Sequence, residues 1–191
     1  MKLIWQRRVF PLARTFRISR RLQTVFRTVI VRLYSGGTHG LGEAVPDAYF
    51  AESAAGLEDD LAAIGEVVAP LMLTCENLDA MLDAASARLR HGRSALAGLD
   101  LAAHDLLAKA AGMPVWKLLG LAPPKPTPIA YCVDIRPLKE MIRQAARHPD
   151  RSFIKIKLGC PHDVEAVQES AAAPARGCGW TRMPHGPSRR R

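Results

Sequence analysis

Residues 152–159 read SFIKIKLG, and this stretch decides the fold class of the C-terminal part of the chain. Its period of two places Phe153, Lys155 and Lys157 on one face of a strand, with aliphatic side chains on the other. In a parallel strand covered by helices, the aliphatic face packs under the helices and the lysines point to the opposite side. Two neighbouring ammonium groups repel each other, which favours a neutral amine that can act as a base near pH 7. The competing interpretation is an amphipathic strand whose lysines are only solvated.

The segments around this stretch alternate between strand and helix patterns. A strand is predicted for IAYCVDI (129–135), a helix for PLKEMIRQAARH (137–148) and the start of a helix for HDVEAVQ (162–168). This order is typical of a parallel sheet or barrel. Before it, LAPPKPTP (121–128) contains four prolines in eight residues and is predicted to be a linker.

The N-terminal part has a different pattern. Near-alternate apolar residues in 2–12 and 24–35, followed by turn glycines and a third short strand, predict an antiparallel meander. From 51 to 119 the period is helical, and the third predicted helix begins at Ser94, a candidate cap, and ends at Gly112. Small residues along this helix imply that another backbone packs closely against it.

Composition excludes several classes of function. The chain has 191 residues, is 48% hydrophobic and carries a formal net charge of +9, so it can bury a core. The basic excess lies in residues 2–32 and after Glu169, without interleaved aromatics, so nucleic-acid binding is not expected. The four cysteines form no C-x-x-C pair, which favours a reduced cytoplasmic protein without zinc or disulfides. No apolar run has the length of a membrane span, so no membrane association is expected.

Four features together resemble the enolase superfamily in its muconate-lactonizing, mandelate racemase-like branch. They are the meander with GLGEAVP (40–46), the helical segment ending in KLLG (95–120), the proline linker and the K-x-K strand ending in KIKLG (155–159). Within this branch, FRISR (16–20) and AYFAES (48–53) look most like the dipeptide epimerases, such as L-Ala-D/L-Glu epimerases. The resemblance covers about residues 1–168. It implies an α+β N-terminal capping domain (1–122) followed by the first two βα units of a (β/α)8 TIM-type barrel (123–168).

The resemblance also implies a chemistry. Members of the family use Mg²⁺ to assist proton transfer at the carbon next to a carboxylate of a small-molecule substrate. Lys157 matches the family's acid/base lysine and Lys155 its partner. Arg20 or Arg21, in a capping loop over the substrate, would pair with an anionic side chain. Cys132 stands on the first barrel strand, at a substrate-facing position where these epimerases often carry a hydroxyl residue.

The acidic residues depart from the family pattern. None of them matches the family's three carboxylate metal ligands: they lie in the cap (Glu43, Asp47, Glu52) or on the helix after the lysine strand (Asp163, Glu165, Glu169). The second-face lysine is also lacking. The chain is therefore interpreted as a truncated member that binds no Mg²⁺ and is inactive.

The tail, residues 169–191, is predicted to be an aberrant, disordered basic segment, because after Glu169 it has five arginines and no acid. If the DNA that encodes residues 177–184 is translated in a reading frame shifted by two nucleotides, it can encode Leu-Arg-Val-Asp-Ala-Asn-Ala. The Asp codon in this frame needs no assumption, because the last base of the Trp180 codon and the first two bases of the Thr181 codon always give GAC. The family carries such a motif, with its first metal ligand, on the next strand. The tail is therefore interpreted as the product of a frameshift between about Glu169 and Arg176.

Two alternatives stay open. One is another muconate-lactonizing-type enzyme, such as a cycloisomerase or an o-succinylbenzoate synthase. The other is a non-catalytic binding protein with a basic arm, which a pulldown with intact barrel subunits or nucleic acid would test. A homo-oligomer is possible in either case.

Overall fold

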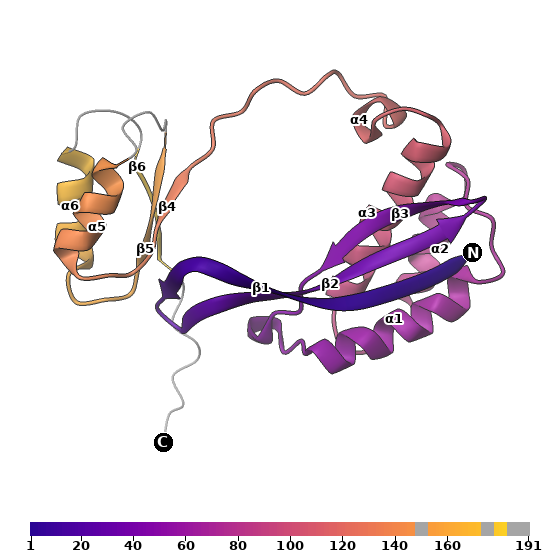
Figure 1. Cartoon of the computed structure of the whole chain (residues 1–191), viewed down its shortest axis with the longest axis horizontal. Coiled ribbons are helices and arrows are strands. Elements are labelled where there is room, and N and C mark those ends of the chain that lie inside the picture. Colours follow the sequence, from indigo (N-terminus) through magenta and orange to yellow (C-terminus); the bar gives the residue numbers. More distant parts are fainter. Residues whose placement is uncertain (148–152, 173–177, 183–191) are drawn as a thin grey trace. The chain divides into compact units, whose positions relative to one another are not determined.

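The computed structural model describes residues 1–147, 153–172 and 178–182, and the chain divides into two compact units (Figure 1). Unit 1 comprises Met1–Phe10 and Arg27–Pro124, and unit 2 comprises Pro11–Phe26 and Lys125–Arg191. The boundary after Pro124 falls inside the proline-rich segment. The hairpin segment 11–26, which the sequence assigns to the capping domain, belongs to unit 2, because its contacts are with the barrel strands described below.

Unit 1 is built on the predicted antiparallel meander. Its sheet has the strand order β1 (Lys2–Ile18), β2 (Arg21–Ser35), β3 (Thr38–Ala44). β2 and β3 pair from Val29 opposite Ala44 to Ser35 opposite Thr38. The turn between them is Gly36–Gly37, with φ of 57° and 81°, which glycine adopts without steric cost.

The capping loop expected around residues 16–21 is shorter than predicted. Strand pairing continues to Ile18 and resumes at Arg21, so that only Ser19 and Arg20 form the turn. Pro11 does not interrupt β1, because β1 is an edge strand of the sheet and can lack one N–H donor on its open side.

The helices of unit 1 are α1 (Ala54–Val68), α2 (Leu78–Ser86), α3 (Ser94–Ala110) and α4 (Val115–Leu118), preceded by the 3-10 turn η1 (Ala48–Phe50). The prediction that Ser94 caps α3 is wrong. Ser94 is the first helical residue, and its hydroxyl donates to the Glu52 carboxylate, with the Val45 carbonyl oxygen also within 2.9 Å, instead of accepting a helix N–H. None of the helices in the described ranges is long and apolar enough to cross a membrane.

α3 packs directly on β3, as its small residues predicted. A Cβ atom added to Gly42 would lie 1.9 Å from the Gly98 carbonyl oxygen, and one added to Gly40 would lie 1.9 Å from that of Ala102. Backbone therefore meets backbone across this interface. Around it, one buried core joins the sheet to α1, α2 and α3 through residues such as Val31, Leu33, Leu61, Ile64 and Leu99.

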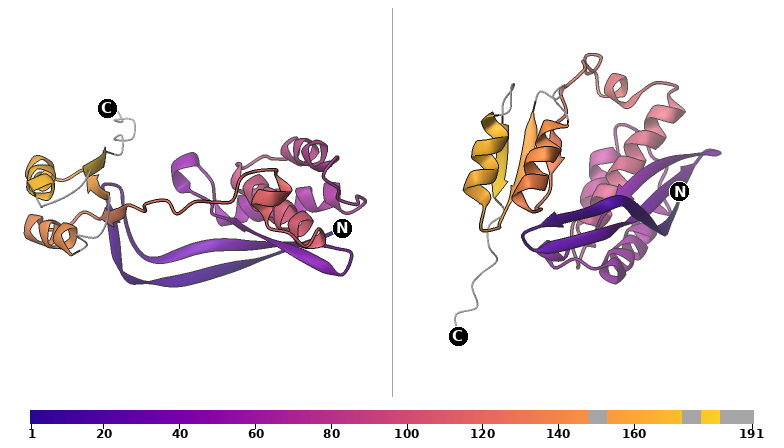
Figure 2. Two further views of the ribbon diagram at one scale, coloured as in Figure 1. Left: turned by 90° about the horizontal axis from the view of Figure 1, so that it is seen from above. Right: turned by 60° about the vertical axis from the view of Figure 1, so that its left-hand side comes forward.

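Unit 2 contains the start of the barrel. The parallel strands β4 (Tyr131–Val133), β5 (Ile154–Leu158) and β6 (Cys178–Arg182) alternate with helices α5 (Leu138–Ala146) and α6 (Asp163–Ala172), in the strand order β4, β5, β6. Figure 2 shows α5 and α6 side by side along the sheet. The core between the helices and the sheet consists of Val133, Met141, Ala145, Ile156, Leu158 and Ala166.

Two segments of the tail that was predicted to be disordered (169–191) have regular secondary structure. α6 continues to Ala172, and β6 pairs in parallel with β5 from Cys178 opposite Ile154 to Arg182 opposite Leu158. The pairing occupies the N–H and C=O groups along one side of β5, which would otherwise be an open edge. The rest of the predicted tail (173–177 and 183–191) lies outside the described residues.

Candidate functional site

The two faces of β5 differ as the period of two predicts. Ile156 and Leu158 are buried under α5 and α6. On the opposite face the Lys155 side chain is exposed and Lys157 is half-buried. The strand thus carries two cationic side chains on the side of the sheet that neither α5 nor α6 covers.

Cys132 joins the two lysines on this face. It lies on β4 directly opposite Lys155 in the parallel register, and neighbouring residues of parallel strands point to the same side. Burial raises the pKa of the Cys132 thiol, and the charges of Lys157 and Lys155 oppose this effect only in part. The structure therefore brings together three of the five predicted site residues, and the thiol among them is mainly protonated at neutral pH.

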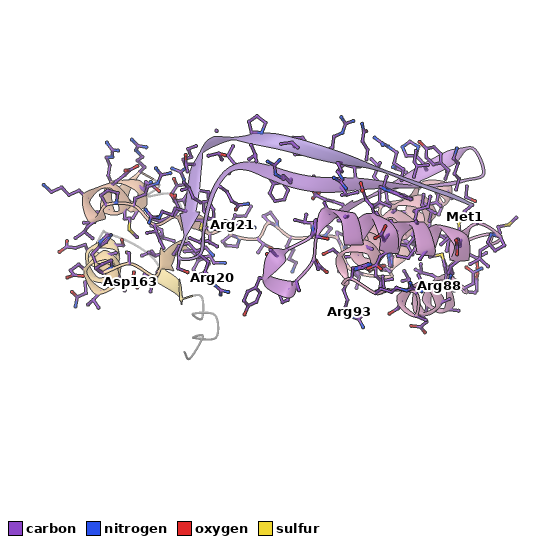
Figure 3. All side chains as sticks on the ribbon, turned by 90° about the horizontal axis from the view of Figure 1, so that it is seen from below. Met1, Arg20, Arg21, Arg88, Arg93 and Asp163 are labelled. Atoms are coloured by element: carbon purple, nitrogen blue, oxygen red, sulfur yellow. The ribbon has the colours of Figure 1, made fainter. Side chains whose placement is uncertain are left out.

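Arg20 and Arg21 lie at the closed end of the β1–β2 hairpin (Figure 3). The tip of this hairpin is attached to the segment that follows β4, because Ile135 N–H donates to the Arg17 carbonyl at 3.0 Å. Arg14 adds a hydrogen bond of 2.8 Å to the Tyr131 hydroxyl and lies over its ring. Both predicted arginines thus belong to the same unit as the lysines.

The tip also meets the end of β5. Gly159 follows the last residue of β5 and has a φ of +129°. A Cβ atom at this position would lie 2.4 Å from the Ser19 Cβ atom, so a larger residue would push the turn away. The turn that carries Arg20 therefore lies against the carboxyl end of the lysine strand, the end at which parallel barrels place their chemistry.

Two residues near this edge were missed by the sequence analysis. Asp134 directly follows β4 and is fully buried, and Arg136 binds it at 2.9 Å. The sequence analysis assigned Asp134 to the strand itself. The sequence did contain an indication of its role, because an ionisable residue at the carboxyl end of a predicted parallel strand lies at the edge of the sheet where barrels place functional groups.

The acidic residues do not form a metal site. Within residues 1–147, 153–172 and 178–182, no three His, Cys, Asp or Glu side chains converge. Asp163 instead accepts the N–H groups of Gly159 and Cys160, and Glu52 accepts the hydroxyl and the N–H of Ser94. A hard divalent cation needs several oxygen ligands at one point, so these residues do not fit Mg²⁺.

A separate groove of about 660 Å³ lies in unit 1. It is lined mainly by apolar residues of the sheet, α3 and α4, among them Phe10, Leu41, Leu101 and Val115. None of the five predicted site residues lines it. The residues for which the sequence predicts chemistry therefore lie outside this groove.

Comparison with known proteins was made on the sequence and on the fold. The family model described as "Mandelate racemase / muconate lactonizing enzyme, N-terminal domain" matches residues 4–120. An L-Ala-D/L-amino acid epimerase from Flavobacterium johnsoniae is 30% identical over 169 residues, which are 88% of this chain and 49% of that protein. The chain thus spans about half the length of the curated relatives it matches.

Solved structures give the same result. An enolase family member from Agrobacterium tumefaciens with homology to dipeptide epimerases, with bound sodium, L-Ala-L-Glu and an ordered loop, superposes with a TM-score of 0.79 at 28% identity, covering 93% of this chain and 52% of that one. A dipeptide epimerase from Methylococcus capsulatus, complexed with Mg and L-Arg-D-Lys, gives a TM-score of 0.81 at 25% identity over 94% and 52% of the two chains.

Proposed function

Because the chain belongs to the mandelate racemase/muconate lactonizing enzyme family of the enolase superfamily, we propose that it is part of a racemase or epimerase that moves the proton next to a substrate carboxylate. The substrate class in this proposal is a dipeptide, since the similar proteins include dipeptide epimerases. The chain carries the capping domain and the beginning of the barrel.

The observation that carries the proposal is the position of the two lysines. Lys155 and Lys157 lie on the face of β5 opposite its helices, beside the carboxyl end of the strand. If the lysines were only solvated, no particular residues would be expected beside them. Here a second strand contributes Cys132 to the same face, and the hairpin turn lies against the same edge.

Each residue then has a distinct role in the proposal. Lys157 takes the proton from the α-carbon as the general base, and Lys155 stands beside it on the same face of β5. Cys132 lines the substrate face as a neutral thiol. Arg20 or Arg21 binds an anionic group of the substrate, because a guanidinium can donate two parallel hydrogen bonds to a carboxylate.

The metal is a separate part of the proposal. In this chemistry a divalent cation stabilises the negative charge that develops on the substrate carboxylate. The described residues do not fit such a cation. We therefore propose that this chain alone binds no Mg²⁺ at the lysine face and does not turn over substrate.

The frameshift interpretation gains support from the position of β6. Trp180 and Thr181 stand opposite Ile156 and Lys157 in the register of β5. In the shifted frame, the Asp codon spans these two residues. A carboxylate introduced there would stand on the strand next to the lysines, where a metal ligand of this reaction is needed.

The proposed function can be tested on an extended protein, made by restoring the shifted frame near Glu169 and continuing into the downstream DNA. Its epimerase activity would be followed by polarimetry on L-Ala-L-Glu, on dipeptides without an acidic side chain and on N-succinylamino acids. We expect turnover of dipeptides, and a preference for the acidic one that Arg20→Gln or Arg21→Gln reduces. Turnover of N-succinylamino acids only would overturn the dipeptide assignment, and downstream DNA without a barrel would favour the binding protein with a basic arm.

A further inference from the structure

An ion pair with a fully buried carboxylate lies where the hairpin tip meets the barrel strands. Asp134 has no exposed surface, and its Oδ2 atom accepts two hydrogen bonds, from the backbone N–H of Arg17 at 3.0 Å and from Arg136 Nε at 2.9 Å. One carboxylate oxygen thus connects the hairpin to the loop that follows β4. We propose that Asp134 and Arg136 form a latch that holds the hairpin tip (residues 11–26) on the carboxyl ends of β4 and β5.

Arg136 uses its planar fork for this connection. While Nε binds Asp134, Nη2 donates to the backbone carbonyl of Thr15 on the hairpin. The Arg136 carbonyl in turn contacts the His162 ring at 2.8 Å, just before α6. Lysine carries all its donors on one nitrogen and lacks the planar fork that reaches both acceptors, so the arrangement favours arginine.

The hairpin tip needs such a latch because a two-stranded ribbon is marginally stable by itself. Other attachments of the tip include the Arg14–Tyr131 contact, which is exposed, the Ile135–Arg17 backbone bond and the packing of Ser19 on Gly159. A charge-assisted pair with a buried partner is stronger than a neutral backbone bond or an exposed contact. Loss of Arg136 leaves the buried Asp134 carboxylate without its ion-pair partner, whereas loss of Asp134 leaves the partly exposed Arg136 beside Glu140, 3.8 Å away.

The latch also positions the turn that carries Arg20 and Arg21. With the latch closed, the turn is held against the end of the lysine strand; with it open, the two arginines are carried away from that edge. Asp134 and Arg136 are thus positioning residues for the binding of an anionic substrate group. This consequence rests on the proposed function, whereas the latch itself does not.

Limited trypsin proteolysis of the full chain tests the latch, because the tip contains Arg14, Arg17, Arg20 and Arg21 as cleavage sites. Cleavage after these residues would be followed by mass spectrometry in Asp134→Asn and Arg136→Gln. We expect it to be about tenfold faster in both variants, the effect of losing one charge-assisted hydrogen bond when cleavage tracks the open population. Arg88→Gln is the matched control, because it removes an equivalent side chain from an exposed ion pair with Glu66 in unit 1.

Hydrogen exchange separates a latch from a general loss of stability. In both variants, the amides of the tip should exchange faster while those of β5 keep their protection. The double variant should open the tip no more than either single variant, and Arg136→Lys should restore little. Unchanged exchange and cleavage at the tip, or equal loss of protection in β5, would overturn the latch. An extended protein in which the latch closes but acidic dipeptides are not preferred would contradict the proposed function only.

Discussion

At the scale of single residues, Cys132 shows two effects acting in opposite directions on one pKa. Burial removes water from the thiolate and raises the pKa of the thiol, while the ammonium groups of Lys157 and Lys155 favour the thiolate. Burial prevails. Strand periodicity predicted which residues share this face, but it could not predict the outcome, because burial depends on segments distant in the sequence.

The charge of Lys157 can be tested through this thiol. Since only the thiolate is alkylated, each unit by which the pKa rises slows alkylation below that pKa about tenfold. Lys157→Met removes the larger opposing charge, so the pKa of Cys132 should rise further, and alkylation by iodoacetamide at pH 8 should slow several-fold. Cys75, which is exposed, serves as the internal reference in peptide mass spectrometry. An alkylation rate of Cys132 that is unaffected by the substitution would mean that Lys157 does not act on it.

At the scale of elements, the α3–β3 interface permits glycine only at its closest approaches. Gly42→Ala would place a Cβ atom 1.9 Å from a helix carbonyl oxygen, so helix and strand must separate, and we expect the free energy of unfolding to fall by about 2–4 kcal/mol. Gly65→Ala, in the interior of α1 with nothing within 4 Å, should raise it by about 0.5–1 kcal/mol. Urea titration measures both. Equal effects of the two substitutions would contradict the packing described.

The beginning of α3 depends on the Glu52 carboxylate. Burial raises the pKa of Glu52, but hydrogen bonds from the Ser94 hydroxyl and from the N–H groups of Asp47, Ser94 and Arg93 outweigh it and hold the pKa below its usual value. A carboxyl whose pKa is lowered on folding stabilises the protein above its unfolded pKa, about 4.3, and loses this contribution as the pH falls through the folded value.

Glu52→Gln should therefore lower the free energy of unfolding by about 2 kcal/mol at pH 7, with a smaller difference at pH 3, because the contribution of the carboxylate is progressively lost below the unfolded pKa. Glu66→Gln, at an exposed ion pair, is the control and should change stability by less than about 0.5 kcal/mol. Urea titrations at the two pH values measure the effect. If the difference in free energy of unfolding between wild type and Glu52→Gln were the same at both pH values, the charge of Glu52 would not be what stabilises the start of α3.

The elements with strong periodicity could be predicted from the sequence, but the contacts made at their ends could not. The meander, the K-x-K strand and the close packing of α3 follow from alternation and small residues. The role of Ser94 did not, because its hydroxyl is recruited by Glu52, forty-two positions away. The role of Asp134 was missed for the same reason, because it depends on a contact with Arg17, 117 positions away.

At the scale of the whole molecule, the sequence indicated two parts joined by a proline-rich linker, and the structure has two units. Local patterns could not show that the hairpin tip (residues 11–26) belongs to unit 2 with the barrel strands, while the rest of β1 and β2 belongs to unit 1. As a result, the lysines, Cys132 and the arginines lie in one unit, although they come from segments far apart in the sequence. This arrangement is the basis of the proposed proton transfer.

The most direct measurement of that claim is exchange of the substrate α-proton with solvent. The extended protein, with Mg²⁺, would be incubated with L-Ala-L-Glu in deuterium oxide, and the α-proton signal followed by proton NMR. We expect the signal to disappear with the intact lysine pair and to be retained in Lys157→Ala for one stereoisomer, because that substitution removes the base on one face only. Unchanged exchange in Lys157→Ala would contradict the assignment of this lysine as the base, and with it the central claim.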